Sequence, residues 1–290
     1  IEAKKVYQYN DEHNETKPMT LTDGQFHFKL EPATENENKQ PLNNTDIPMP
    51  VGAANGVASA VNNAAGTITF ADITYSLDNR DNGNIYYYLL TEDSTNKQNN
   101  IDYSTEKYLI KAEVSGEGTE AKPLRVTTTY FKDNNGTWTQ VNGSDLIFTN
   151  TFTGEATAKL GVSKSISGRG WNDTDLFTFT LKAEGNAPMP ADEGGKTVTA
   201  EKGATIADFD IITYKKAGIY TYTISEGDTT ISGMHKAADV TATVTVVLDA
   251  ESNKLQATVV YSSTDTENNK AKFVNTYNTT PYKANTSELF

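Results

Sequence analysis

Apolar and polar residues alternate with a period of two along most of the chain, and helical periodicity is nearly absent. The alternating segments are rich in threonine, valine, tyrosine and phenylalanine, which favour strands. They form two series, which predict strands at residues 25–30, 66–75, 85–91, 107–114, 125–132, 137–141 and 147–152, and then at 160–166, 176–183, 219–225, 238–248, 255–261 and 272–277. The fold class is therefore expected to be all-β.

Three connecting segments differ from this pattern. Residues 133–136 lie between two predicted strands and read Asp-Asn-Asn-Gly, which is typical of a hairpin turn rather than a metal loop. Residues 78–83 resemble a calcium loop, but an arginine occupies a ligand position, which favours a polar connection between strands. Residues 51–65 are rich in alanine, asparagine and glycine and predict either a long loop or one short helix.

The second series of strands repeats the first, with longer loops in the first copy. Matching segments occur in the same order: 25–30 with 176–181, 48–50 with 188–190, 86–92 with 220–226, and 148–152 with 273–277. Because no helix is available to cover a sheet, a two-sheet sandwich buries each apolar face most simply. We expect two tandem immunoglobulin-like β-sandwich domains at 1–152 and 159–278, a linker at 153–158 and a C-terminal tail at 279–290.

Composition excludes several kinds of chemistry. The chain has 25 Lys and Arg against 38 Asp and Glu, and this net charge of -13 disfavours binding to nucleic acids or anionic membranes. It has no cysteine, which excludes thiol catalysis, disulfides and cysteine-ligated metals. The three histidines, His13, His27 and His235, lie in separate segments, so we expect no metal site and no cofactor.

No segment approaches the ~18 consecutive apolar residues of a membrane span, so no membrane contact is expected from this segment. The sequence begins at Ile1 without a methionine. It is therefore expected to be a processed protein or an excised fragment.

Three polar residues in each copy fall on an apolar strand face. They are Lys5, Glu92 and Asn150 in the first copy, and Lys164, Glu226 and Asn275 in the second. In the first strand the neighbouring Lys4 falls on the polar face instead. A buried ammonium or carboxylate costs several kcal/mol unless it is paired or neutralised. Each domain must therefore contain groups that pair with or neutralise its buried lysine and glutamate.

Two interpretations of these residues are open. In the first, lysine and glutamate form a buried salt bridge beside the asparagine, or all three lie at solvated strand ends. In the second, burial lowers the pKa of the lysine and raises that of the acid, so a neutral amine attacks the asparagine carboxamide. The acid then polarises the carbonyl and passes protons to the departing ammonia, which leaves an internal Lys–Asn amide. The recurrence of all three residues in both copies favours this self-catalysed single turnover, and no other enzymatic activity is expected.

These motifs resemble the isopeptide-linked pilin domains of Gram-positive surface proteins, the FctA-type streptococcal major pilin family. The resemblance covers nearly all of residues 1–277 and is carried by Lys5-Val6-Tyr7 and Lys164-Ser165-Ile166, the Tyr-x-Tyr-x-apolar-x-Glu segments at 86–92 and 220–226, and the Phe-x-Asn-x-aromatic segments at 148–152 and 273–277. It implies that the lysines are nucleophiles, the asparagines acyl partners and the glutamates proton shuttles.

The resemblance also implies a function. The chain is expected to be a structural stalk or shaft segment of a pilus or surface adhesin, in which an autocatalytic bond ties the first strand of each domain to the last. It would be extracellular and attached to the cell wall, with neighbouring domains or pilin subunits as partners. A sortase sorting signal is absent, so the anchor is expected outside this segment.

Two functional alternatives remain. Residues 137–147 contain no lysine for linkage between subunits, which favours a stalk of repeated domains in a larger adhesin over a polymerising backbone pilin. The other alternative is a binding function: a region of an adhesin that binds a host ligand through loops of the first domain, such as residues 51–65.

Overall fold

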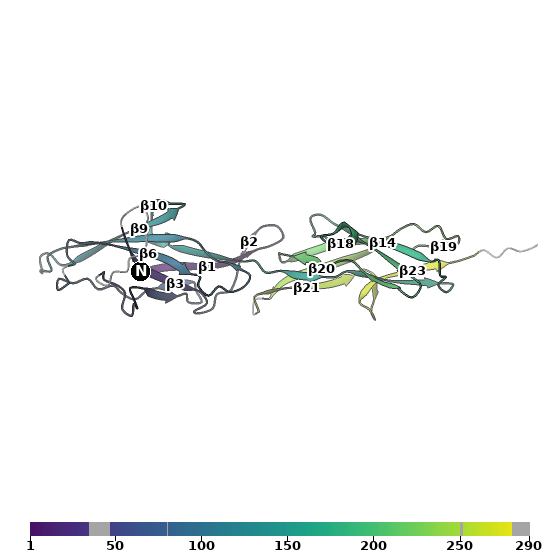
Figure 1. The fold of residues 1–290 in the computed structure, drawn as a ribbon, viewed down its shortest axis with the longest axis horizontal. Coiled ribbons are helices and arrows are strands. Elements are labelled where there is room, and N and C mark those ends of the chain that lie inside the picture. Colours follow the sequence, from purple (N-terminus) through teal and green to yellow (C-terminus); the bar gives the residue numbers. More distant parts are fainter. Residues whose placement is uncertain (35–46, 80, 250–251, 280–290) are drawn as a thin grey trace, which may run out of the picture. The chain divides into compact units, whose positions relative to one another are not determined.

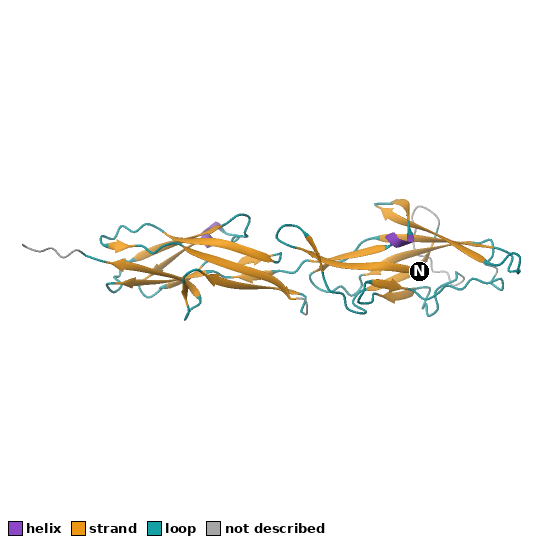
Figure 2. Ribbon diagram, turned by 180° about the vertical axis from the view of Figure 1, so that it is seen from behind, coloured by secondary structure: helices purple, strands orange, loops and turns teal. Residues whose placement is uncertain are grey.

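The computed structural model of the chain describes residues 1–34, 47–79, 81–249 and 252–279. Its regular secondary structure is almost entirely strand, as Figures 1 and 2 show, which confirms the all-β fold class. Within the described ranges, helical geometry is limited to two short 3-10 turns, Gly143–Asp145 and Glu193–Lys196. No described helix has the length and apolarity needed to cross a membrane. Most of the predicted tail, residues 280–290, lies outside the described residues.

The chain divides into two compact units. The first comprises Ile1–Asn10 and Glu15–Thr153, and the second comprises Asp11–Asn14 and Gly154–Phe290. Each unit holds two main sheets, with the large apolar side chains buried between them. The prediction of two tandem immunoglobulin-like β-sandwich domains is therefore confirmed at the level of the fold.

The first unit has one five-stranded and one six-stranded sheet. The five-stranded sheet has the order β2 (Thr16–Pro18), β1 (Glu2–Asn10), β11 (Ile147–Phe152) and β7 (Ile101–Asp102), with β5 (Thr67–Thr69) also paired to β1. The six-stranded sheet has the order β10 (Thr137–Val141), β9 (Arg125–Asn134), β8 (Lys107–Ser115), β6 (Ile85–Asp93), β3 (His27–Ala33) and β4 (Ala58–Val61).

The second unit has two five-stranded sheets and one separate strand pair. One sheet has the order β16 (Ile206–Asp208), β13 (Gly161–Ser167), β23 (Lys270–Tyr277) and β19 (Met234–His235), with β22 (Thr264–Asp265) also paired to β23. The other has the order β15 (Thr197–Glu201), β14 (Leu176–Ala183), β18 (Gly218–Glu226), β20 (Val240–Asp249) and β21 (Lys254–Tyr261). The separate pair is β12 (Ala156–Ala158) with β17 (Ile212–Tyr214).

The first and last strands of each sequence copy are neighbours in one sheet. β1 pairs in parallel with β11, and Lys5 lies opposite Phe148, two residues before Asn150. The second unit has the same parallel register between β13 and β23. Residues two apart on a strand point to the same face. The lysine and the asparagine of each unit therefore project from adjacent strands into the same interior.

The glutamate strand belongs to the opposite sheet. Glu92 on β6 pairs with Phe28 on β3, and Glu226 on β18 pairs with Phe179 on β14. Each of these phenylalanines meets a phenylalanine of the last strand across the sandwich: Phe28 with Phe148 at 5.2 Å and Phe179 with Phe273 at 4.9 Å between ring centroids. The same aromatic contact therefore sets the distance between the two sheets in both units.

The repeated Pro-Met-Pro segments are attached to the sandwich by a buried tyrosine. Tyr88 donates a hydrogen bond to the carbonyl of Pro48 at 2.7 Å, and Tyr222 donates to the carbonyl of Pro188 at 2.7 Å. Each hydroxyl also lies within 3.0 Å of a second phenol. A buried hydroxyl needs such partners. The sequence match between the two copies therefore reflects one tertiary contact made twice.

The segment predicted as a linker, residues 153–158, contains a strand. Ala156 and Ala158 on β12 are buried, and the strand pairs with β17 of the second unit. Three residues with small apolar side chains are too few to carry a clear strand signal. The chain therefore enters the second sandwich before the first strand that the sequence predicts there.

Residues 51–65 are neither a continuous loop nor a helix. They contain β4, which pairs with β3 and buries Ala58 and Ala60. The next predicted strand, at 66–75, is reduced to β5. Alanine is depleted in strands, so β4, with Val61 as its single strand-favouring residue, has a weak propensity signal in the sequence.

The turn at residues 133–136 joins β9 to β10, as predicted. Asn135 and Gly136 have φ angles of 54° and 92°, the left-handed values that a type I′ hairpin requires at both central positions. The Gly136 N–H donates to Asp133 Oδ1 at 2.7 Å. The segment is therefore a structural turn.

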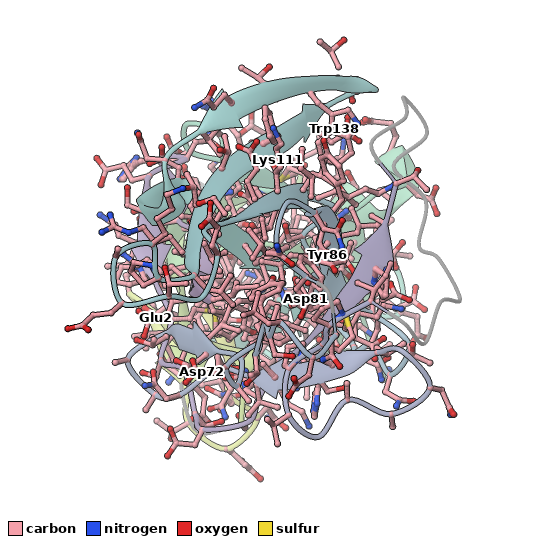
Figure 3. The ribbon with its side chains drawn as sticks, turned by 90° about the vertical axis from the view of Figure 1, so that its left-hand side faces the viewer. Glu2, Asp72, Asp81, Tyr86, Lys111 and Trp138 are labelled. Atoms are coloured by element: carbon pink, nitrogen blue, oxygen red, sulfur yellow. The ribbon has the colours of Figure 1, made fainter. Side chains whose placement is uncertain are left out.

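In the connection at residues 78–83, Arg80, the residue that argued against a calcium loop, lies outside the described residues, and the described part holds a buried carboxylate. Asp81 is 1% exposed and accepts hydrogen bonds from the Tyr86 hydroxyl and the Ser76 N–H, both at 2.7 Å. Figure 3 labels Asp81 and Tyr86 side by side in the first unit. The strand connection is as predicted, and its buried anchor is a feature that sequence did not indicate.

Candidate functional site

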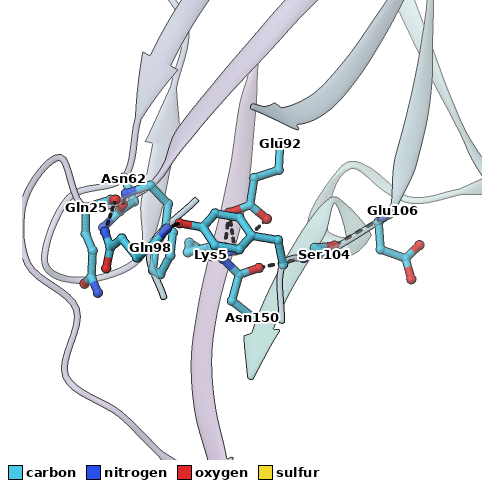
Figure 4. Close-up of polar contacts among 10 residues, drawn as sticks. Lys5, Gln25, Asn62, Glu92, Gln98, Ser104, Glu106 and Asn150 are labelled. Carbon is cyan, nitrogen blue, oxygen red and sulfur yellow. Dashed lines mark hydrogen bonds and ion pairs between the residues drawn. The ribbon is translucent and has the colours of Figure 1, made fainter. Parts of the chain in front are cut away.

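The first unit brings its three predicted site residues together. Lys5 Nζ lies 2.7 Å from Glu92 Oε1 and 2.9 Å from Oε2, and Asn150 Nδ2 donates to Glu92 Oε1 at 2.8 Å. Figure 4 shows the three side chains meeting between the strands that carry them. Their exposed fractions are 1%, 7% and 0%. They are therefore buried and in contact, and they do not lie at a solvated strand end.

The second unit contains the same cluster. Lys164 Nζ donates to Glu226 Oε2 at 3.0 Å, and Asn275 Nδ2 donates to Glu226 Oε1 at 2.6 Å. The three residues are 2%, 2% and 0% exposed. Each glutamate thus accepts from both the amine and the carboxamide nitrogen, which places a proton acceptor between these two groups.

Aromatic rings exclude water from both lysines. Lys5 Nζ lies 4.5 Å from the centroid of the Phe26 ring, and Lys164 Nζ lies 4.6 Å from that of Phe177. Each of these rings makes an edge-to-face contact with a further aromatic ring: Phe26 with Tyr103 at 5.6 Å, and Phe177 with Trp171 at 5.4 Å between ring centroids. Such walls lower the local dielectric and strengthen every charge interaction within the cluster.

Burial changes the acidity of the amines. It lowers the pKa of Lys5 from an ordinary value of 10.5 to about 8, although the Glu92 carboxylate opposes this shift. Burial also lowers the pKa of Lys164, again against the influence of Glu226. A lower pKa increases the fraction of neutral amine near neutral pH, and only the neutral amine is a nucleophile.

The carboxamide oxygens do not face the glutamates. Asn150 Oδ1 accepts a hydrogen bond from the backbone N–H of Ser104 at 2.7 Å, and Asn275 Oδ1 accepts one from the backbone N–H of Ala237 at 2.8 Å. Each glutamate contacts the nitrogen end of the carboxamide instead, so the predicted polarisation of the carbonyl by glutamate stays a prediction that no contact in this arrangement supports. Sequence could not identify Ser104 or Ala237, since a backbone donor has no residue signature.

No alternative metal site is present in the described ranges. Their histidines, aspartates and glutamates form no group of three or more that could hold a metal ion. His13, His27 and His235 are all exposed and belong to different segments. Besides the two lysine, glutamate and asparagine clusters, the buried polar residues of the described ranges are Asn62, Asp81 and Asp175.

The comparison with protein families matches both units. The matching model is FctA, described as the Spy0128-like isopeptide containing domain, and it covers residues 1–153 and 160–278. Together these matches span most of the chain. The chain belongs to this family. Its two units are tandem copies of one isopeptide-type domain.

The individual proteins that resemble this chain have low sequence identity to it. A curated pilin of Streptococcus pyogenes serotype M1 is 23% identical over 212 residues, which are 70% of this chain and 56% of that protein. The chain therefore spans little more than half the length of this relative. A variant of the Streptococcus pyogenes major pilin aligns over 96% of this chain and 98% of its own, with 17% identity and a TM-score of 0.37. The C-terminal fragment of the pilus adhesin SpaC from Lactobacillus rhamnosus GG covers 98% and 100%, with 13% identity and a TM-score of 0.28.

The lowered pKa of Lys5 predicts a pH-dependent stability in an unreacted first unit. Asn150→Ala keeps the Lys5–Glu92 pair but removes the acyl partner. Between pH 8 and 10.5 the unfolded chain binds a proton on Lys5 that the folded unit does not, so stability should rise with pH across this window. The full rise is roughly 3 kcal/mol. Urea unfolding of the first unit at a series of pH values measures it.

The matched control is Lys5→Met in the same Asn150→Ala background, which removes the titrating amine. The rise should disappear in this double variant. If the stability difference between the two variants stays constant from pH 7.5 to 10.5, the lowered lysine pKa is contradicted.

Proposed function

We propose that this chain is a structural shaft or stalk segment of a Gram-positive surface pilus or adhesin, in which each domain joins its first strand to its last by an autocatalytic Lys–Asn amide. The observation that carries the proposal is the buried lysine, glutamate and asparagine cluster, which recurs with the same contacts in two domains that differ in their loops. Membership of the isopeptide domain family and the similarity to a streptococcal pilin support it.

The reaction needs no cofactor or co-reactant. The neutral Lys5 amine attacks Asn150 Cγ and forms a new C–N bond. The proton that the amine loses passes through Glu92, which already hydrogen-bonds both nitrogens, to Nδ2. The Cγ–Nδ2 bond then breaks and ammonia leaves. Lys164, Glu226 and Asn275 would react in the same way.

Proximity supplies most of the acceleration. Amide aminolysis is slow in water, but reacting groups fixed in contact behave as if at very high concentration. The lysine and asparagine are held on adjacent, hydrogen-bonded strands, and glutamate fixes both nitrogens from the opposite sheet. A buried ion pair alone would satisfy the lysine and glutamate. It gives no reason for a carboxamide at the same place in both domains.

The strand arrangement links the bond to mechanical function. β1 and β11 run parallel as neighbours, so the start of one and the end of the other lie at opposite ends of the pair. Tension along a stalk enters a domain at its first strand and leaves at its last. An amide between Lys5 and Asn150 would carry that load covalently and keep the intervening chain from extending.

Location and partners follow from the same proposal. A segment of this kind would stand outside the cell as part of a structure attached to the wall. Its partners would be neighbouring domains or pilin subunits of the same structure.

The host-ligand adhesin alternative has less support. It needs exposed aromatic or apolar residues clustered on the longer loops of the first domain. Residues 51–65 contain no aromatic residue, and their exposed large apolar side chains are Val51 and Val61. A recognition surface built on this segment would therefore have little apolar area.

Intact mass of the folded protein tests the chemistry. Each bond releases ammonia, so the wild-type chain should weigh about 34 Da less than its sequence, and Lys5→Ala or Glu226→Ala about 17 Da less. Lys4→Ala is the matched control for Lys5→Ala, because Lys4 is the exposed neighbour on the same strand, and it should keep both losses. A wild-type mass equal to that of the sequence would reject the proposal. A Glu226→Ala chain that keeps both losses would remove Glu226 from the mechanism.

Single-molecule pulling tests the mechanical role. The proposed second bond encloses 111 residues, the difference between positions 275 and 164. In Asn275→Ala the second domain should extend by about 400 Å under load, whereas the wild-type domain should not extend. By analogy with disulfide loops, losing the bond should also cost roughly 5 kcal/mol of stability.

The control for pulling is Thr276→Ala, which changes the exposed neighbour of Asn275 on β23 and should behave as wild type. Equal unfolding forces and equal extensions for wild type and Asn275→Ala would show that the bond carries no load.

A further inference from the structure

Each domain places a backbone N–H at the carboxamide oxygen through the same piece of architecture. The two-residue strands β7 and β19 run antiparallel to the ends of β11 and β23. In the first domain Asp102 pairs with Thr151, the residue after the asparagine, and the donor is Ser104, two residues further on. In the second domain His235 pairs with Thr276, and the donor is Ala237, again two residues further on.

This N–H fixes which way the carboxamide points. A backbone N–H can only donate, so the atom that faces it must be the carboxamide oxygen. The NH₂ group is thereby directed to the glutamate, at 2.8 Å in the first domain and 2.6 Å in the second. The reverse orientation would set two donors against each other at Ser104 or Ala237. The carboxamide orientation is therefore fixed before any reaction begins, with the leaving nitrogen at the glutamate and the carbonyl oxygen at the backbone N–H.

The same N–H lies where negative charge would develop. When the lysine nitrogen adds to Cγ, the carbonyl π electrons move to Oδ1, and this oxygen becomes an oxyanion until the Cγ–Nδ2 bond breaks. Donors within 2.7–3.1 Å of an oxyanion stabilise the transition state, most strongly in a site without water. In the unreacted sites the N–H nitrogens already lie 2.7 and 2.8 Å from the carbonyl oxygen that would become the oxyanion.

We propose that the backbone N–H groups of Ser104 and Ala237 are catalytic groups of the two self-reactions, each acting as an oxyanion donor to the asparagine carbonyl. This inference rests on the proposed function and assigns a task that the glutamates, which contact the nitrogen end, do not perform in this geometry. It also explains why the two donor positions need not share a residue type. A serine and an alanine present the same N–H.

Replacing an amide by an ester removes this donor alone. In the full chain, Ala237 is replaced by lactic acid, which substitutes an ester oxygen for the N–H and keeps the methyl group. The adjacent Ala238 gives a matched control, since the same replacement there leaves the Ala237 N–H in place. Each chain is held unfolded in denaturant, diluted to start folding, and followed by intact mass.

With the ester at 237, closure of the second bond should slow about 100- to 1,000-fold, while the first domain closes at the wild-type rate in the same molecule. With the ester at 238, both bonds should close at wild-type rates. Equal rates for the second bond in the two ester chains would overturn the inference. The first domain keeps its own donor, so its loss of ~17 Da shows whether the proposed self-reaction occurs at all. The rate of the second bond then tests the donor at Ala237 alone.

A side-chain substitution in the first domain provides a second, independent test of the backbone donor. Ser104→Ala removes the hydroxyl and keeps the N–H, so the first bond should close at the wild-type rate. A strongly slowed first bond in Ser104→Ala would assign the effect to the side chain and contradict a backbone donor.

Discussion

The buried lysine is the group on which the rest of each domain depends. An ammonium without water costs several kcal/mol unless an acceptor reaches it, and in both domains that acceptor is a glutamate from the opposite sheet. The first strand, the glutamate strand and the last strand must therefore meet at one level of the sandwich. The register of β1 on β11 and of β6 on β3 achieves this, and the second domain repeats it. Loop lengths differ between the copies, but these registers do not.

The same constraint links chemistry to mechanics. Parallel pairing of the first and last strands brings the lysine and asparagine together, and it also places the proposed bond between the points where load would enter and leave a domain. Residues 151–163 lie between the two proposed bonds and outside both closed loops. They carry β12, so a stretch of chain without covalent protection is held by pairing with β17 and by the burial of Ala156 and Ala158.

Much of this could be predicted from sequence because it depends on side-chain alternation. An inward lysine such as Lys5 beside an outward Lys4 is visible as a break in a period of two, and the repeat makes the break significant. The features that sequence missed lack such a signal. Strand β12 is too short and its side chains are too small to give a strand signal, and three of the four residues of β4 are alanine or serine. The donors at Ser104 and Ala237 are backbone groups, whose positions depend on tertiary structure alone.

The most direct measurement of the central claim is a proteolytic digest of the folded, purified chain analysed by tandem mass spectrometry. Because the chain has no cysteine, a covalent branch between distant segments cannot be a disulfide. The account predicts two branched peptides, one joining Lys5 to Asn150 and one joining Lys164 to Asn275, each about 17 Da lighter than its two linear parts. Recovery of all four residues in linear peptides of unaltered mass would contradict it.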